Sequence, residues 1–234
     1  MVKFLIYLVA PLVLILPVNA QQNATQNAAQ NVKVITQQQV KQFQEKRTQF
    51  QAEIQKKQTE FKQELDAKRA ELKNRVETQK QTLKENLSKI RNTQKQQTVE
   101  RINDQINALN KKMTDHYSTV LENLENILDR ISSRADKAET NGRDISSVKT
   151  ALTATQTAIA NGRAAIKTQA EKTYTFTINT EATLKTDVGK ARQALHDDLV
   201  KVRNMAKAAQ QAVKDAAVAL GQIPEVDKLE ISSQ

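Results

Sequence analysis

Apolar residues recur along the first half of the chain at alternating intervals of seven and four residues. The series is Phe43, Phe50, Ile54, Phe61, Leu65, Leu72, Val76, Leu83 and Leu87. Seven plus four makes a period of eleven, or about 3.67 residues per turn, which keeps an apolar stripe on one face of a nearly straight helix. The pattern predicts a long helix with a narrow coiled-coil seam, for which we select Phe43, Phe50, Ile54, Phe61, Leu65 and Leu72.

This helix is expected to continue well beyond the seam. No Gly or Pro occurs between Val32 and Thr140, so no residue there is expected to break it. From Ile102 a third apolar position joins each repeat, and a wider stripe needs more than one packing partner. We therefore expect a basic helical stalk over residues 36–98 that runs without interruption into a bundle over residues 99–221.

Two further helices are predicted to complete the bundle. Asn141-Gly142 is a typical C-terminal stop, and helical stripes follow from Ile145 and from about Glu181. Residues 173–178 alternate polar and apolar side chains, and we expect an extended connector whose aromatic side chains pack on the bundle. Short connections favour antiparallel neighbours. The predicted fold is all-α: a long basic coiled-coil helix that folds back into an antiparallel three-helix bundle, followed by a loose tail at 222–234.

The N-terminus has the order of a secretory signal. Lys3 precedes an apolar run over residues 4–16, and Ala20 follows at a position suited to signal peptidase. The run is shorter than the roughly 20 residues that span a bilayer. We expect residues 1–20 to be a signal peptide, with retention as an anchor as the alternative. Residues 21–35, rich in Gln and Asn, are expected to form a flexible leader. The predicted location is the periplasm, the cell surface or the extracellular space.

The residue composition argues against an enzyme. The chain has no Cys, which excludes disulfides, thiolate metal ligands and a cysteine nucleophile. Its two histidines, His116 and His196, lie far apart without metal-site spacing, and no glycine-rich phosphate loop or nucleophile elbow occurs. We expect no enzyme activity, no catalytic residues, no cofactor, no metal and no small-molecule substrate.

The positive charge is concentrated in the stalk. The net charge is +10, and residues 40–112 hold 18 Lys+Arg against 10 Asp+Glu, whereas residues 113–234 hold 16 of each. Three interpretations stay open: a solvated coiled-coil surface, contact with an anionic membrane or envelope polymer, or binding of nucleic acid, which export and the lack of a recognition motif disfavour. The candidate residues for anionic contact are Arg47, Lys57, Lys68, Arg69, Lys80 and Arg91.

Two short stretches carry a resemblance. They are Asn141-Gly142-Arg143-Asp144 before an Ala-rich helix and Lys172-Thr173-Tyr174-Thr175-Phe176 before the last helix. With the signal and the basic repeat, they make the chain similar to exported helical, coiled-coil proteins of small-genome bacteria, a resemblance that implies no known activity. More loosely, the basic, exported helical arms resemble those of Skp-type periplasmic holdases, which implies binding of unfolded clients. In those proteins an opening strand builds a trimeric barrel, and residues 31–36 match it poorly.

These observations define the expected function. We expect an exported, non-enzymatic structural or interaction protein of the cell envelope, whose basic stalk self-associates or contacts an anionic surface. The alternative is a Skp-like holdase chaperone for unfolded exported proteins.

Overall fold

The computed structural model describes the backbone of residues 18–176, 178, 180–224 and 226, with side chains at residue 38 and from residue 41 onward. It divides into two compact units, residues 1–44 and residues 45–234. The described part of the first unit is helical. Most of the predicted signal peptide lies outside the described residues. Residues 21–35, the expected flexible leader, lie within a helix, since Gln and Ala favour helix and neither Gly nor Pro interrupts them.

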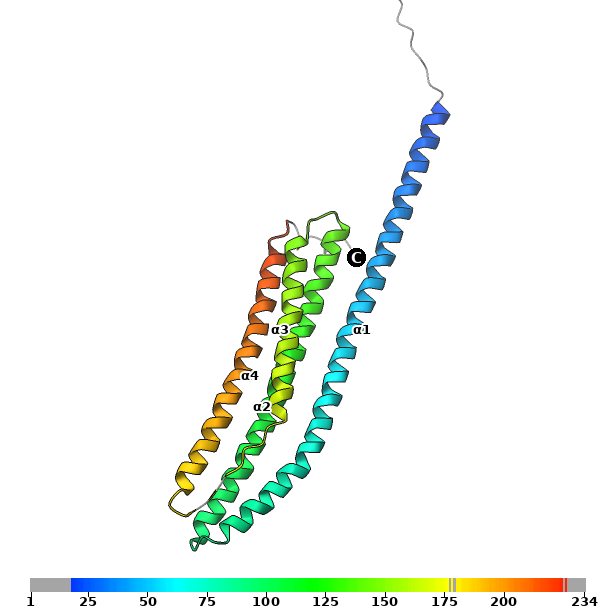
Figure 1. The fold of residues 1–234 in the computed structure, drawn as a ribbon. Coiled ribbons are helices and arrows are strands. Elements are labelled where there is room, and N and C mark those ends of the chain that lie inside the picture. The colour runs from blue at the N-terminus through cyan, green and yellow to red at the C-terminus, as the bar shows by residue number, and fades with distance from the viewer. Residues whose placement is uncertain (1–17, 177, 179, 225, 227–234) are drawn as a thin grey trace, which may run out of the picture. The chain divides into compact units, whose positions relative to one another are not determined.

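The described residues form four α-helices and no strand, which confirms the all-α prediction. They are α1 (Val18–Leu87), α2 (Thr93–Thr140), α3 (Ser146–Ala170) and α4 (Leu184–Gly221). Within the second unit, α2, α3 and α4 lie side by side, and the chain reverses direction between α1 and α2 (Figure 1).

The reversal corrects one prediction. The helix expected to be continuous from the stalk into the bundle ends at Leu87, and α2 starts at Thr93. A turn at Ser88–Asn92 replaces it: the Ile90 amide donates to the Leu87 carbonyl (2.9 Å), and the Asn92 side chain caps α2 by accepting from the Lys95 amide (3.0 Å). Leu87 and Ile90 are buried, so tertiary packing stabilises a turn that has neither Gly nor Pro. Residues 45–87 therefore run back along α2 instead of projecting beyond it as a stalk.

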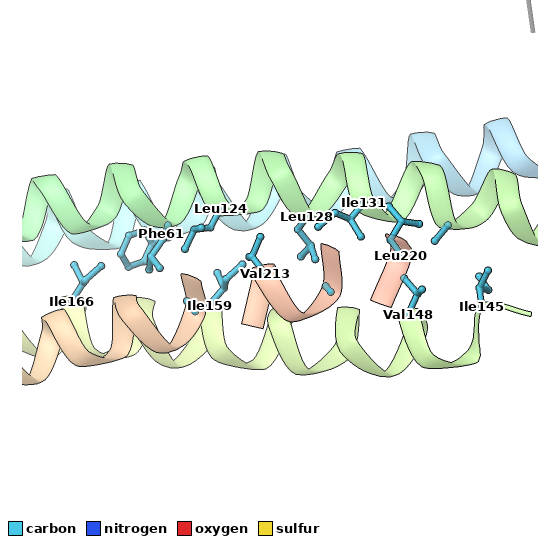
Figure 2. Packing of buried hydrophobic residues seen from close by; sticks show 14 of the residues in the cluster. Phe61, Leu124, Leu128, Ile131, Ile145, Val148, Ile159, Ile166, Val213 and Leu220 are labelled. Carbon is cyan, nitrogen blue, oxygen red and sulfur yellow. The ribbon is translucent and has the colours of Figure 1, made fainter. Parts of the chain in front are cut away.

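Two apolar clusters form the core of the second unit. One joins all four helices and includes Phe61, Leu124, Ile166 and Val213. In Figure 2, Phe61 of α1 points into the same layer as Leu124 of α2 and Ile166 of α3. The other cluster lies at the turn end of the unit, where Leu83, Leu87 and Ile90 meet the side chains of the connector and of α4. The aromatics of the connector, Tyr174 and Phe176, are buried in it, as expected.

Small residues let α2, α3 and α4 approach closely. A Cβ on Gly162 would lie 3.0 Å from a methyl group of Leu121, so this glycine of α3 contacts α2. Thr155 of α3 donates to the Ala212 carbonyl of α4 (3.0 Å), and Ala209 and Ala216 are fully buried. Gly142 ends α2 with a φ of 75°, which favours glycine. Ile223 and Val226 are buried, so the start of the tail packs on the unit rather than lying loose.

Candidate interaction surface between α1 and the other helices

Residues 45–87 of α1 are joined to α2 by a regular ladder of ion pairs. Lys62 pairs with Glu122 (3.1 Å), Arg69 with Asp115, and Lys80 with Asp104 (3.0 Å). The three cations are separated by seven and then eleven residues, and their partners by the same intervals in reverse order. Seven and eleven are both near-whole numbers of helical turns, so each set lies on one face of its helix. The period that spaces the apolar seam therefore also spaces the charges of an antiparallel helix pair.

Arg69 makes the most connected of these links. Its guanidinium also donates to the Thr114 hydroxyl (3.2 Å), and its side chain is 20% exposed. Burial alone would raise the pKa of Asp115, but the hydrogen bond from Lys111 and the charge of Arg69 outweigh it and hold that pKa below its usual value. For Lys80, the hydrogen bond to Asp104 raises the pKa. The contacts of the ladder therefore favour the charged forms of Asp115 and Lys80.

One link is buried and includes an aromatic ring. Glu125 of α2 is 5% exposed and accepts from Arg163 of α3 (2.6 Å) and from Gln58 of α1 (2.9 Å). Arg163 also lies over the ring of Phe61, 5.4 Å from its centroid, within cation–π range. Burial raises the pKa of Glu125, and the Gln58 hydrogen bond and the Arg163 charge oppose that shift. This cluster fixes α1 against two helices at once.

The apolar part of the surface is incompletely packed. Hollows of about 220 Å³, 460 Å³ and 260 Å³ follow α1 along its length. The first is lined by Phe50 and Ile54, the second by Leu72 and Val76, and the third by Leu83, each together with side chains from outside α1. These hollows are partly open to solvent, so apolar contact beside them is incomplete. The polar links therefore add to the buried apolar contacts that Phe61, Leu65 and Leu83 make.

The predicted seam residues lie on this surface to differing degrees. Phe61 and Leu65 are buried in the four-helix cluster, and Phe50 packs against it. Ile54 and Leu72 are half-buried beside the hollows. Phe43, in the first unit, is half-buried. From residue 50 to residue 72 the seam therefore packs against helices of its own chain.

The predicted anionic contacts divide into two groups. Lys68, Arg69 and Lys80 are half-buried and pair with Glu171, Asp115 and Asp104, so they are engaged within the chain. Arg47, Lys57 and Arg91 are exposed, and Lys57 pairs with Glu53 of its own helix. Contact with an outside partner stays a prediction for all six.

The acidic half of the ladder was missed by the sequence argument. Asp104, Asp115, Glu122, Glu125 and Asp129 bind α1, Asp129 by accepting from Gln51 (3.1 Å). A signal was present, because residues 113–140 hold six acidic and three basic side chains. Over residues 113–234 as a whole, basic and acidic residues are equal in number, and this balance concealed the local acidic excess.

A buried polar network lies beneath α1. Asn110 donates to the carbonyls of Gln169 and Lys172, and Gln169 donates to Asn110 and to the Tyr174 hydroxyl. Tyr174 donates in turn to Asp198 (3.0 Å), which also pairs with Lys172 and Lys201. Burial raises the pKa of Tyr174, so its hydroxyl stays a donor. The network joins α2, α3, the connector and α4 into one body that α1 covers.

The described side chains contain no group of three or more potential metal ligands. Nor does any described helix combine the length and the apolar character needed to cross a membrane. Comparisons with protein-family models, curated proteins and solved structures return no significant match to the chain.

Proposed function

We propose that the chain is an exported, non-enzymatic interaction protein of the cell envelope that uses α1 as its binding element. In this proposal α2, α3 and α4 act as an antiparallel three-helix body. Helix α1 is a basic coiled-coil element that contacts an anionic surface and mediates self-association. The signal-like N-terminus and the absence of catalytic motifs support export and a non-enzymatic role.

The observation that supports anionic contact is the division of the basic residues on α1 and in the turn that follows it. Lys68, Arg69 and Lys80 are taken up by acidic partners from other parts of the chain, whereas Arg47, Lys57 and Arg91 stay exposed, Lys57 beside Glu53 of its own helix. The fold therefore leaves cations at the surface after the internal pairs have formed. Exposed cations attract anionic lipid or polymer, each contributing about 1 kcal/mol near a membrane surface.

Vesicle cosedimentation tests this contact. The protein is expected to sediment with vesicles containing anionic lipid but not with neutral vesicles, and high salt should release it because screening shortens the range of the charges. The variant Arg47→Gln/Lys57→Gln/Arg91→Gln should lose most of the binding. Its matched control, Lys190→Gln/Arg203→Gln/Lys207→Gln, removes three exposed charges from α4 and should retain it. If both variants lost the same amount of vesicle binding, the net charge of the protein, and not these three residues, would explain the contact. Binding to neither vesicle type would exclude the contact.

A holdase role is the second candidate, supported by the hollows beneath α1. The 460 Å³ hollow is lined by apolar Leu72 and Val76 and by charged side chains of both signs, among them Lys73 and Glu77, a lining suited to apolar segments of an unfolded chain that are flanked by charges. A holdase should suppress aggregation of an unrelated denatured protein at near-stoichiometric ratio. Leu72→Gln/Val76→Gln should abolish that effect, and an absence of suppression by the unmodified protein would remove this candidate.

A further inference from the structure

We propose that two copies of the chain exchange α1, so that residues 45–87 of each copy occupy the surface of α2 and α3 on the other. The exchange rests on the proposed self-association and names its partner, a second copy of this chain. Four observations carry it: the complementarity of the surface, the composition of the turn, the register of the repeat and the loose packing of α1.

The surface that α1 covers recognises this segment specifically. The ladder from Lys62–Glu122 to Lys80–Asp104 requires cations and acids at matching seven- and eleven-residue intervals. Phe61 must reach Arg163 at the same register. The α1 of a second copy presents the same groups in the same order and therefore fits the surface equally well. Exchange of an identical element in this way is a low-cost route to a dimer.

The turn between α1 and α2 is also able to become helix. Ser88–Asn92 contains neither Gly nor Pro, and Gly142 is the only described glycine with positive φ. Local support for the turn comes from the Asn92 cap on the Lys95 amide and from the Ser88 hydroxyl, which donates to the Glu85 carbonyl (2.7 Å). Straightening would give up these bonds and the buried position of Ile90, and would add helical hydrogen bonds through the five residues. It would join α1 and α2 into one helix.

The apolar repeat passes through the turn in a register that the hairpin does not use. Counting in elevens from Leu65 leads to Leu87, Thr98 and Leu109. In the hairpin Val99 is buried instead of Thr98, and Leu109 is left 45% exposed. A straight helix would return Leu109 to the stripe that contains Leu87. Apart from the polar Thr98, the apolar spacing therefore stays in phase across residues 88–92, as it would in a continuous helix.

Detaching α1 is made easier by its packing. The hollows beside Phe50, Leu72 and Leu83 reduce the number of close contacts that must be broken. Every polar link that breaks within one copy forms again between copies. The two states therefore differ mainly in the conformation of the turn and in the entropy of association, so the population of the dimer should rise with protein concentration.

Cross-linking of two single-cysteine variants tests the exchange directly, because the natural chain has no cysteine. One variant carries Gln51→Cys and the other Asp129→Cys, at a side-chain contact between α1 and α2. The two are mixed in denaturant, refolded together and treated with a short bismaleimide. This reagent is preferred because a disulfide needs Cα atoms within about 7 Å. Exchange predicts a covalent species of twice the chain mass in the mixture and not in either variant alone.

A matched pair controls for random collision. Glu139 of α2 and Lys149 of α3 form an exposed ion pair that stays within one copy in either state. Mixed Glu139→Cys and Lys149→Cys chains should give no such species. The absolute mass of the unmodified protein, measured by light scattering over a range of concentrations, is recorded alongside.

Two substitutions at the turn move the equilibrium in opposite directions. Asn92 has an extended backbone and Thr93 is the first residue of α2, so Thr93→Pro fits the hairpin. Within a continuous helix, however, proline is strongly unfavourable, and it should lower the dimerisation constant more than about a hundredfold. Asn92→Ala removes the cap and favours helix, so it should raise the dimer fraction.

The outcomes separate this inference from the proposed function. Dimer mass with the mixed covalent species, abolished by Thr93→Pro, supports exchange. Dimer mass without the mixed species overturns exchange but leaves self-association through another interface. A monomer at every concentration overturns both exchange and self-association, and the vesicle experiment then decides the anionic contact separately.

Discussion

The guanidinium of Arg69 on α1 pairs with the carboxylate of Asp115 on α2 and reaches the Thr114 hydroxyl one residue earlier. The pair lies between Lys62–Glu122 and Lys80–Asp104, which are seven and eleven residues away along α1. A basic residue that appeared from the sequence to face an outside partner thus helps to attach α1 to its own chain.

Arg69→Gln should weaken that attachment. The pair is partly exposed, so we expect a loss of about 1 kcal/mol in the free energy of unfolding, measured by urea denaturation. High salt should reduce the difference between variant and parent, because it screens the lost charge pair. Lys56→Gln is the control, since Lys56 is exposed and its partner, Glu60, is on its own helix. An equal loss in the control would contradict a specific role for Arg69.

Arg163→Met should destabilise the protein more strongly. It leaves the carboxylate of Glu125 buried without its cationic partner, at a cost of about 3 kcal/mol. The double variant Glu125→Gln/Arg163→Met removes both charges and should recover most of the lost stability. Urea denaturation of the two variants measures the difference. If the double variant is no more stable than Arg163→Met, loss of the contact between Arg163 and Phe61, rather than an unpaired charge, explains the effect.

Gly162→Ala should destabilise despite the better helix propensity of alanine. Its Cβ would lie 3.0 Å and 3.1 Å from the two methyl groups of Leu121, which is almost completely buried and has little room to move. We expect a net loss of about 1 kcal/mol. Gly189→Ala is the matched control, because no atom lies within 4 Å of its added Cβ, and it should gain about 0.5 kcal/mol. Thermal unfolding of both variants tests the difference in sign.

Asp198 should contribute to resistance against acid. Burial opposes its ionisation, but hydrogen bonds from Lys172, Lys201 and Tyr174 lower its pKa to about 2 from an ordinary 3.8. A carboxyl with a lowered pKa stabilises the fold above its unfolded pKa, and that stability is lost as the pH falls through the folded value. Asp198→Asn should therefore cost about 2 kcal/mol at neutral pH and little at pH near 2.

Urea denaturation at a series of pH values measures this contribution. The neighbouring Asp197→Asn is the control, because Asp197 is exposed and accepts from Gln193 of its own helix. The free energy of unfolding of Asp198→Asn should approach that of the parent as the pH falls to 2. A constant difference over this range would contradict the lowered pKa of Asp198.

The helical class and most helix ends followed from local sequence. The stop at Asn141-Gly142 and the burial of Tyr174 and Phe176 in the connector were both predicted, and each depends on a short-range pattern. The turn at Ser88–Asn92 was not predicted. It has no glycine or proline, and its support comes from the burial of Leu87 and Ile90 against residues distant in sequence.

The sequence by itself determined that this chain is helical and that its apolar and basic residues recur with an eleven-residue period. Periodicity is a property of neighbouring turns, and each helix expresses it wherever it lies. Only the tertiary structure decided which surface meets that pattern. Arg69 and Lys80 face Asp115 and Asp104 because the chain reverses at residue 88, and a charge pattern on one helix does not specify whether its complement belongs to the same chain or to another.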